Sequence, residues 1–155
     1  MTAPTPPSRR GEPRSRYEID CAGARVRVHA RSLATVLRIE GEIDASNADL
    51  VAEAIRRFAR LKAPLVLDVS HLDFLGSAGL RALLVLNAEH RQARLHCNVV
   101  SGAALRRLTG AATDHGLPVV DSVPEALQNT HDFIHARRQL PPGPARQREP
   151  QRNTD

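Results

Sequence analysis

The sequence places one serine where a reaction or a modification could occur. Ser77 lies between Gly76 and Gly79, directly after a short apolar run and directly before a long apolar helical pattern. Glycines at such a junction let the backbone turn sharply and let another molecule approach closely. A serine hydroxyl there can act as a nucleophile, accept a phosphoryl group, or cap the helix that follows.

Serine-based hydrolysis is the least supported of these chemistries. The nucleophile elbow of hydrolases reads Gly-x-Ser-x-Gly, and Leu75 occupies the position of the first glycine. Asp114, His115 and His131 follow downstream, but nothing in their spacing brings one of them to Ser77. The sequence also has no glycine-rich phosphate loop of the nucleotide-binding types. We therefore expect a protein that is not an enzyme.

Neither a metal site nor a cofactor is indicated. His131 and His135 are four residues apart on an expected helix, but no further ligand accompanies them, so a solvent-facing pair is favoured. Cys21 and Cys97 fit no metal-binding spacing, and we expect both to be free thiols. Redox control through these thiols stays open as an alternative.

The residues around Ser77 resemble a known family. Asp68 to Leu80, which reads Asp-Val-Ser-His-Leu-Asp-Phe-Leu-Gly-Ser-Ala-Gly-Leu, resembles the central segment of STAS domains, the bacterial family of anti-sigma factor antagonists. Ile39–Asp44 resembles the first motif of that family, and the resemblance extends from about Tyr17 to Gln128. It implies that Ser77 is the serine that the family phosphorylates. Gly76 departs from the pattern, because the family normally has aspartate there.

The resemblance implies a protein that switches between a binding and a non-binding state. In the family, the unmodified domain binds an anti-sigma factor, commonly an ATP-binding serine kinase, and so releases a sigma factor. Phosphorylation of the loop serine ends the binding, and a phosphatase is left open as a further partner. The residues implied in partner binding are Asp44, Gly76, Ala78, Gly79 and Leu80, and the polar residues implied in the phosphorylation loop are Asp68 and Asp73.

Two other interpretations stay open at this point. Ser77 could be an ordinary helix N-cap, while Asp68 could simply end a strand and Asp44 begin a turn. The domain could also be a STAS-like scaffold or ligand sensor that is never phosphorylated, and Gly76 favours that alternative. Recovery of an ATP-binding kinase in a pull-down would distinguish the switch from the scaffold.

The elements that position Ser77 alternate between strands and helices after an initial hairpin. Alternating or short apolar runs predict strands at 17–21, 26–30, 35–41, 65–67, 95–100 and 117–120. Helical spacing predicts helices at 50–61, from 77 onward, around 105–108 and through 126–134. The fold class expected is α/β: a single STAS-like domain with a mixed, mostly parallel β-sheet, an initial antiparallel pair and about four helices packed against it.

Two helix starts carry capping patterns. Ser46–Asp49 predicts a capping box, and Asp121–Glu125 combines an N-cap serine, an early proline and a capping glutamate. The helix that begins at Ser77 is apolar on more than one side, since it carries Val85 and Leu86 beside its main apolar face. This helix is therefore either enclosed in the core or part of a partner-binding surface.

The ends of the chain differ from its middle in composition. Residues 1–16 and 139–155 are rich in proline and arginine, so we expect both to be disordered basic tails beside one domain at 17–138. Of the formal charge of +5, residues 1–16 and 136–155 carry +3 each, which leaves −1 for 17–135. A nearly neutral domain with one Tyr, three Phe and no Trp has few rings for stacking bases, so no direct DNA binding is expected.

The sequence carries no pattern that predicts contact with a membrane. A membrane-spanning helix needs roughly 18 or more consecutive apolar residues, and no such stretch is present. The N-terminal residues also lack the apolar core of a signal peptide. We therefore expect a cytoplasmic location and no membrane partner.

Deletion of residues 1–16 and 140–155 is expected to leave the domain folded, because these segments can bury little apolar surface. The thermal midpoint, measured by circular dichroism, should change by less than about 2 °C. A loss of many degrees would mean that one of the tails packs on the domain.

Overall fold

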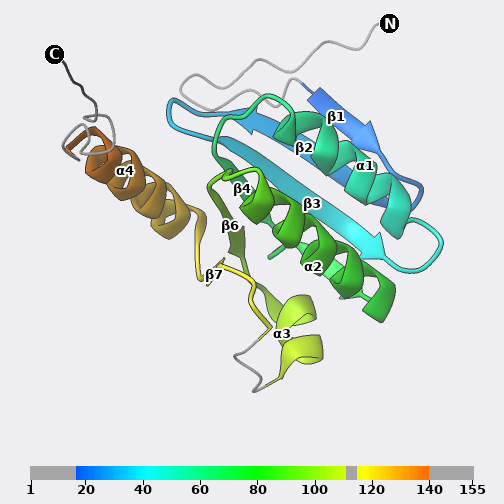
Figure 1. Cartoon of the computed structure of the whole chain (residues 1–155). Coiled ribbons are helices and arrows are strands. Elements are labelled where there is room, and N and C mark those ends of the chain that lie inside the picture. The colour runs from blue at the N-terminus through cyan, green and yellow to red at the C-terminus, as the bar shows by residue number, and fades with distance from the viewer. Residues whose placement is uncertain (1–16, 111–114, 140–155) are drawn as a thin grey trace, which may run out of the picture.

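A computed structural model describes residues 17–110 and 115–139 of the chain (Figure 1). The expected disordered tails lie outside these residues, except for Gln139, which ends a helix. The strands are β1 (Tyr17–Asp20), β2 (Ala24–Ala30), β3 (Thr35–Ile43), β4 (Leu65–Asp68), β5 (Leu72–Leu75), β6 (Cys97–Val100) and β7 (Val119–Val120). The helices are α1 (Ala48–Ala59), α2 (Ser77–Gln92), α3 (Ala103–Thr109) and α4 (Val123–Gln139).

The strands form one mixed sheet in the order β1-β2-β3-β4-β6-β7, with β5 paired beside β3. The pairs β1–β2 and β2–β3 are antiparallel, and all pairs from β3 onward are parallel. A mixed, mostly parallel sheet with an antiparallel start and four helices in the described residues confirms the predicted fold class.

Helices cover both faces of the parallel part of the sheet. Successive strand residues point to opposite faces, so Leu65 and Leu67 in β4 share one face while Val66 lies on the other. Leu65 and Leu67 belong to the main core, which the apolar sides of α1 and α2 complete. Val66 belongs to a smaller cluster with Val100 and Ala126, which is on α4. Figure 1 accordingly shows α1 and α2 side by side, with α4 standing apart from them.

The burial of α2 partly decides between the two interpretations of its apolar pattern. Leu83 and Leu86 are buried, so most of the apolar pattern serves the core. Val85 is exposed and adds to the surface of the same helix. The helix is thus half enclosed rather than sandwiched.

The cap predicted for the last helix is confirmed. The Glu125 amide donates to the Ser122 hydroxyl at 3.1 Å, and the Glu125 carboxylate accepts from the Asp121 amide at 2.9 Å. The first bond satisfies an amide that the first turn of α4 would otherwise leave unpaired, and the second satisfies the Asp121 amide just before the helix.

Strand β5 was not predicted, because a polar turn was expected between β4 and α2. Residues 72–75 instead pair with the end of β3, which lies within 41–44, where that strand was predicted to end. A four-residue strand carries little periodic signal, and its pairing depends on how far another strand extends. β5 is the element that delivers the chain to Ser77.

Asn47 ties the corner between β3 and α1 to the first hairpin. Its buried side chain donates to the Ala22 carbonyl at 3.1 Å and to the Glu42 carbonyl at 2.9 Å, and accepts from the Asp44 amide at 2.9 Å. One amide side chain therefore satisfies backbone groups from two separate turns.

Asn47→Ala is expected to destabilise the fold by about 1–3 kcal/mol, because buried backbone groups at Ala22, Glu42 and Asp44 would lose their partners. Urea unfolding followed by circular dichroism measures this change. Ser46→Ala removes a side-chain bond that is open to water, so its effect should be within about 0.5 kcal/mol. Equal effects of the two substitutions would contradict this role for Asn47.

Gly79 allows α2 to pack directly on the end of β3. A Cβ atom at this buried glycine would lie 2.5 Å from Leu75 Cδ1 and 2.8 Å from Ile43 Cγ2. Gly79→Val should therefore destabilise the fold by about 1–3 kcal/mol, since overpacking outweighs the gain in helix propensity of less than about 1 kcal/mol.

Ala88→Val is the matched control for Gly79→Val, because Ala88 is exposed on the same helix. Its effect should be within about 0.5–1 kcal/mol in the same urea titration, since only helix propensity changes. A fully stable Gly79→Val protein would show that the helix can move away from the sheet at little cost.

Candidate functional site

The candidate site lies where β3 and β5 end and α1 and α2 begin. Ile43 pairs with Leu75, and the Gly76 amide donates to the Ile43 carbonyl at 2.8 Å. This bond places the residues that precede Ser77 beside the loop that contains Asp44. Two of the predicted site segments, which are about 30 residues apart in sequence, therefore meet at one edge.

Ser77 is the first residue of α2 rather than its N-cap. Gly76 holds the N-cap position with extended backbone dihedrals, φ −87° and ψ 176°, and supplies no side chain. The expectation that Ser77 caps the helix is therefore wrong. Because its side chain is exposed and forms no hydrogen bond within the described residues, the Ser77 hydroxyl is accessible at the positive end of the helix dipole.

The capping box predicted at Ser46–Asp49 is also wrong. The N-cap of α1 is Asn47, and Asp44 makes the local bonds instead: its carboxylate accepts from the Ser46 hydroxyl at 2.6 Å and from the Ser46 amide at 2.9 Å. Aspartate readily closes such turns with the backbone two residues on. These hydrogen bonds, with the Ser46 hydroxyl first, lower the pKa of Asp44 below its ordinary value, so its charge persists near the site at neutral pH.

The implied contact residues differ in how far they reach the surface. Gly79 is buried, whereas Gly76, Ala78 and Leu80 are half-buried along the start of α2. A Cβ atom at Gly76 would lie 3.2 Å from the Phe74 ring, a contact that an exposed ring can relieve by moving. The site therefore has room for a side chain at position 76.

The structure separates Asp68 from Ser77. In the register of β3, Arg38 is opposite Asp68 and Ile43 is opposite Leu75, and the strand between these pairs spans roughly 15 Å at about 3.3 Å per residue. Asp68 is 2% exposed and accepts from the Ser70 hydroxyl at 2.6 Å. It organises the turn after β4, which is the structural alternative considered for it.

Asp73, by contrast, lies on β5 close to the candidate site. Its side chain is exposed, and Asp73 lies four residues before Ser77 in the sequence. Together with Asp44, Asp73 places two carboxylate groups at this edge of the sheet. A further negative group added at Ser77 would therefore be placed near carboxylates.

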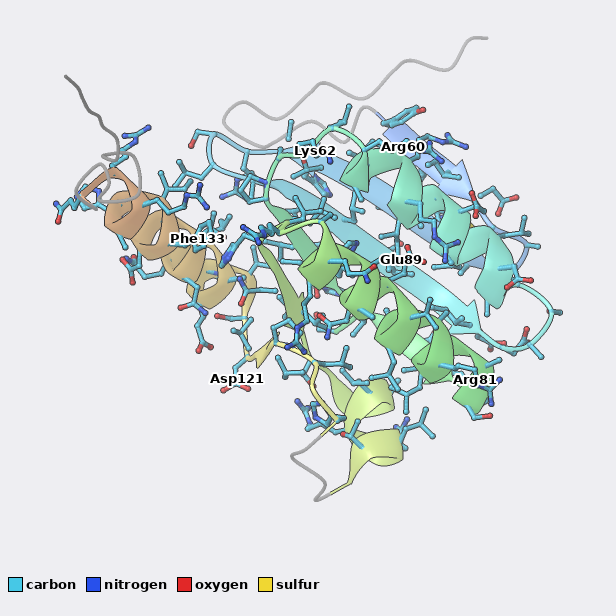
Figure 2. All side chains as sticks on the ribbon, in the orientation of Figure 1. Arg60, Lys62, Arg81, Glu89, Asp121 and Phe133 are labelled. Carbon is cyan, nitrogen blue, oxygen red and sulfur yellow. The ribbon has the colours of Figure 1, made fainter. Side chains whose placement is uncertain are left out.

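Sequence reasoning missed three exposed residues at this edge. Phe74 is 48% exposed on β5, and Leu50 is 50% exposed in the first turn of α1. Arg81 is exposed one helical turn after Ser77, at the beginning of α2 (Figure 2). The spacing of Ser77 and Arg81, four residues apart on a predicted helix, could have identified the arginine. The exposure of Phe74 could not, because it depends on β5.

Other chemical groups do not converge on Ser77. Within residues 17–110 and 115–139, no three residues among His, Cys, Asp and Glu form a group that could hold a metal ion. His131 and His135 stack on the exposed side of α4 with ring centroids 5.2 Å apart, and Asp114 lies outside the described residues. No described helix is long and apolar enough to cross a membrane.

The two cysteines are free thiols, as expected. Burial raises the pKa of Cys21 above its ordinary value and raises that of Cys97 to about 12. Because the thiolate is the reactive form, neither residue is activated for redox chemistry at neutral pH.

Comparison with known proteins identifies the family of this chain. A family model for the STAS domain matches residues 23–126. Osmosensory protein A of Mycobacterium tuberculosis is 37% identical over 127 residues, which cover 79% of this chain and 80% of that protein.

Two solved structures are similar along nearly their whole length. An anti-sigma factor antagonist from Mycobacterium paratuberculosis shares 29% identity with a TM-score of 0.60, over 70% of this chain and 95% of that one. The anti-sigma factor antagonist SpoIIAA in its unphosphorylated form shares the fold, with 15% identity and a TM-score of 0.53 over 74% of this chain and 98% of that one. Because the family model matches more than half of the sequence and the mycobacterial relative is similar over most of both chains, this chain belongs to the STAS domain family.

Proposed function

We propose that this chain is an anti-sigma factor antagonist whose binding is controlled by phosphorylation of Ser77. The unmodified domain binds an anti-sigma factor of the ATP-binding serine-kinase type and so frees a sigma factor in the cytoplasm, without catalysing a reaction itself. The observation that carries the proposal is the exposed Ser77 hydroxyl at the first position of α2. The similarity to a mycobacterial antagonist over nearly its whole length supports the same role.

The start of α2 can accommodate a phosphate on Ser77. A phosphoserine carries about −1.5 to −2 charges at neutral pH, and the unpaired amides of a first helical turn favour such a charge. Arg81 lies one turn along the same exposed side and can pair with it. The modified state is therefore held by groups of this chain.

The same phosphate disfavours the partner-bound state. The proposed contact surface combines Asp44 with half-buried Ala78 and Leu80, and we add the exposed Phe74 and Leu50. Apolar groups bind a partner by excluding water, and a dianion among them retains its hydration. Phosphorylation thus leaves the surface poorly desolvated and adds negative charge beside Asp44.

Gly76 favours a second candidate function, a STAS-domain scaffold or ligand sensor that is not phosphorylated. The aspartate that the family normally has at this position could orient the serine hydroxyl, and glycine cannot. Because glycine replaces aspartate, one negative charge fewer lies beside the phosphate. The phosphorylated state is therefore more stable. If the switch operates, we therefore expect slow phosphorylation and a protein that is mostly competent for binding.

The test uses the full chain with its cognate kinase and radiolabelled ATP. Phosphate incorporation should be slow in the wild type and absent in Ser77→Ala, and Gly76→Asp should accelerate it, because a carboxylate then adjoins the hydroxyl. Ser32→Ala is the matched control, since Ser32 is exposed in the turn between β2 and β3, at the opposite edge of the sheet. It should incorporate phosphate like the wild type.

Partner binding is measured in parallel by calorimetry. Ser77→Glu should weaken binding of the anti-sigma factor by about tenfold or more, and Ser32→Glu, at an exposed serine in the turn between β2 and β3, should not. If the kinase leaves the wild type unmodified and Ser77→Glu binds normally, the switch is wrong for this protein and the scaffold replaces it.

A further inference from the structure

A basic groove lies at the edge of the sheet opposite Ser77. A helix that follows a parallel strand runs back against that strand, so α1, α2 and α4 all end at this edge (Figure 1). Each of them has basic residues in its last turn. The ends of α2 and α4, with Lys62 in the turn after α1, contribute basic residues to the lining at this edge.

Two hollows join to form this groove, with volumes of about 490 and 500 Å³. They share Arg94, Leu95, His96, Phe133 and Arg137, so they are two parts of one depression between the end of α2 and α4. Figure 2 shows Phe133 on α4, with Lys62 and Glu89 at the ends of the helices across from it. The size is that of a small-molecule site.

The groove combines cations with an apolar floor. Arg91, Arg94 and Arg137 line the first hollow, and no Asp or Glu is among the described residues that line either one. Leu95 and the Phe133 ring, which stacks on His96 at 4.3 Å, provide apolar surface. An anion with an apolar portion fits such a lining.

The cations of the groove have no carboxylate partner within residues 17–110 and 115–139. Arg56, at the end of α1, pairs with Glu53 at 2.8 Å and with Glu89 at 2.9 Å. No comparable ion pair involves Arg91, Arg94 or Arg137 in this part of the chain. Basic side chains at helix C-termini compensate the helix dipoles, which explains why these residues are positively charged. It does not explain why they surround a common hollow.

His90 gives a second, independent indication of a ligand. It lines the first hollow, its side chain is 3% exposed, and neither ring nitrogen has a hydrogen-bond partner among the described residues. Buried polar atoms are rarely left unpaired, because each unsatisfied group costs about 1–3 kcal/mol. Both ring nitrogens are themselves almost inaccessible in the free protein, so a ligand oxygen would supply the missing partner once neighbouring side chains have moved.

Two of the basic residues at this edge also adopt an unfavourable backbone conformation. Lys62 has φ 65° and Arg94 has φ 58°, and each follows the end of a helix, where glycine is the usual residue. Side chains other than glycine are uncommon there and often mark functional positions. The chain keeps a cation at both positions instead.

We propose that this groove binds a small organic phosphate. The phosphate lies among Arg94, Arg137 and His90, and the organic portion lies on Leu95 and Phe133. Two guanidinium groups and an imidazole suit a dianion, because each can donate to different phosphate oxygens. The site is independent of Ser77, which is at the other edge of the sheet.

The test titrates the full-length protein with phenyl phosphate and records amide and histidine-ring NMR spectra. Shifts should concentrate at Leu95, Cys97 and Phe133, and inorganic phosphate should bind more weakly because it lacks the apolar portion. The apparent pKa of His90 should rise on binding, because a neighbouring dianion favours the imidazolium.

Several charged or titratable groups around His90 affect that titration. They are Glu89 and Arg91 on its own helix, Arg56 on α1, Arg94 after α2, His96 before β6 and Arg137 on α4. Burial, which is the main cause, lowers the pKa of the free protein's His90 from its ordinary value. The rise on binding starts from this lowered value.

The double variant Arg94→Gln/Arg137→Gln should lose about tenfold or more in affinity for phenyl phosphate. Arg106→Gln/Arg107→Gln on α3 removes the same charge from exposed positions elsewhere and should bind normally. Equal losses in both variants, shifts that map to the start of α2, or no binding at millimolar phenyl phosphate would overturn the proposal. Stronger binding of a glutamate-rich peptide at the same residues would overturn it in favour of a protein partner.

Discussion

The hydrogen bond from the Gly76 amide to the Ile43 carbonyl forms because β3 is long enough to reach Ile43. The candidate site depends on this hydrogen bond and on the length of β3. β3 is nine residues long; it pairs with β2 along residues 35–41, with β4 near its start and with β5 at its end. Only because it extends to Ile43 can β5 align there and deliver the chain to α2. The absence of a side chain at Gly79 then lets α2 lie against the same strand end. Loop and helix are thus placed by one strand.

The sequence predicted the fold well where periodicity was strong. Alternating residues in β2 and β3, and helical spacing in α1, define elements whose side chains contact many neighbours. β5 and the start of α1 were not predicted, for a different reason. Phe74 and Asn47 each act through long-range partners, β3 and the Ala22 turn, which no local pattern records. Local propensity specifies the elements but not the pairings between short segments.

The candidate site, like the fold, could be predicted from the sequence only in part. Ser77 and Asp44 could be singled out from residue type and family pattern, and the structure brings their segments together. Asp68 could not be assigned from its position in the motif, since its distance from Ser77 follows from the register of β4 against β3. The basic groove is formed by residues of three helix ends that are scattered through the sequence, so its existence depends on the topology of the sheet.

The opposite orientation of strands and helices has a consequence for encounters in solution. Asp44 and Asp73 lie with Arg81 at the edge where the helices start, and Arg91, Arg94 and Arg137 lie where α2 and α4 end, so charge is distributed unevenly over the nearly neutral domain. The electric field of a charged partner orients such a molecule before the two surfaces come into contact. Dissolved salt, by screening that field, would therefore slow association with a charged partner more than it loosens the formed complex.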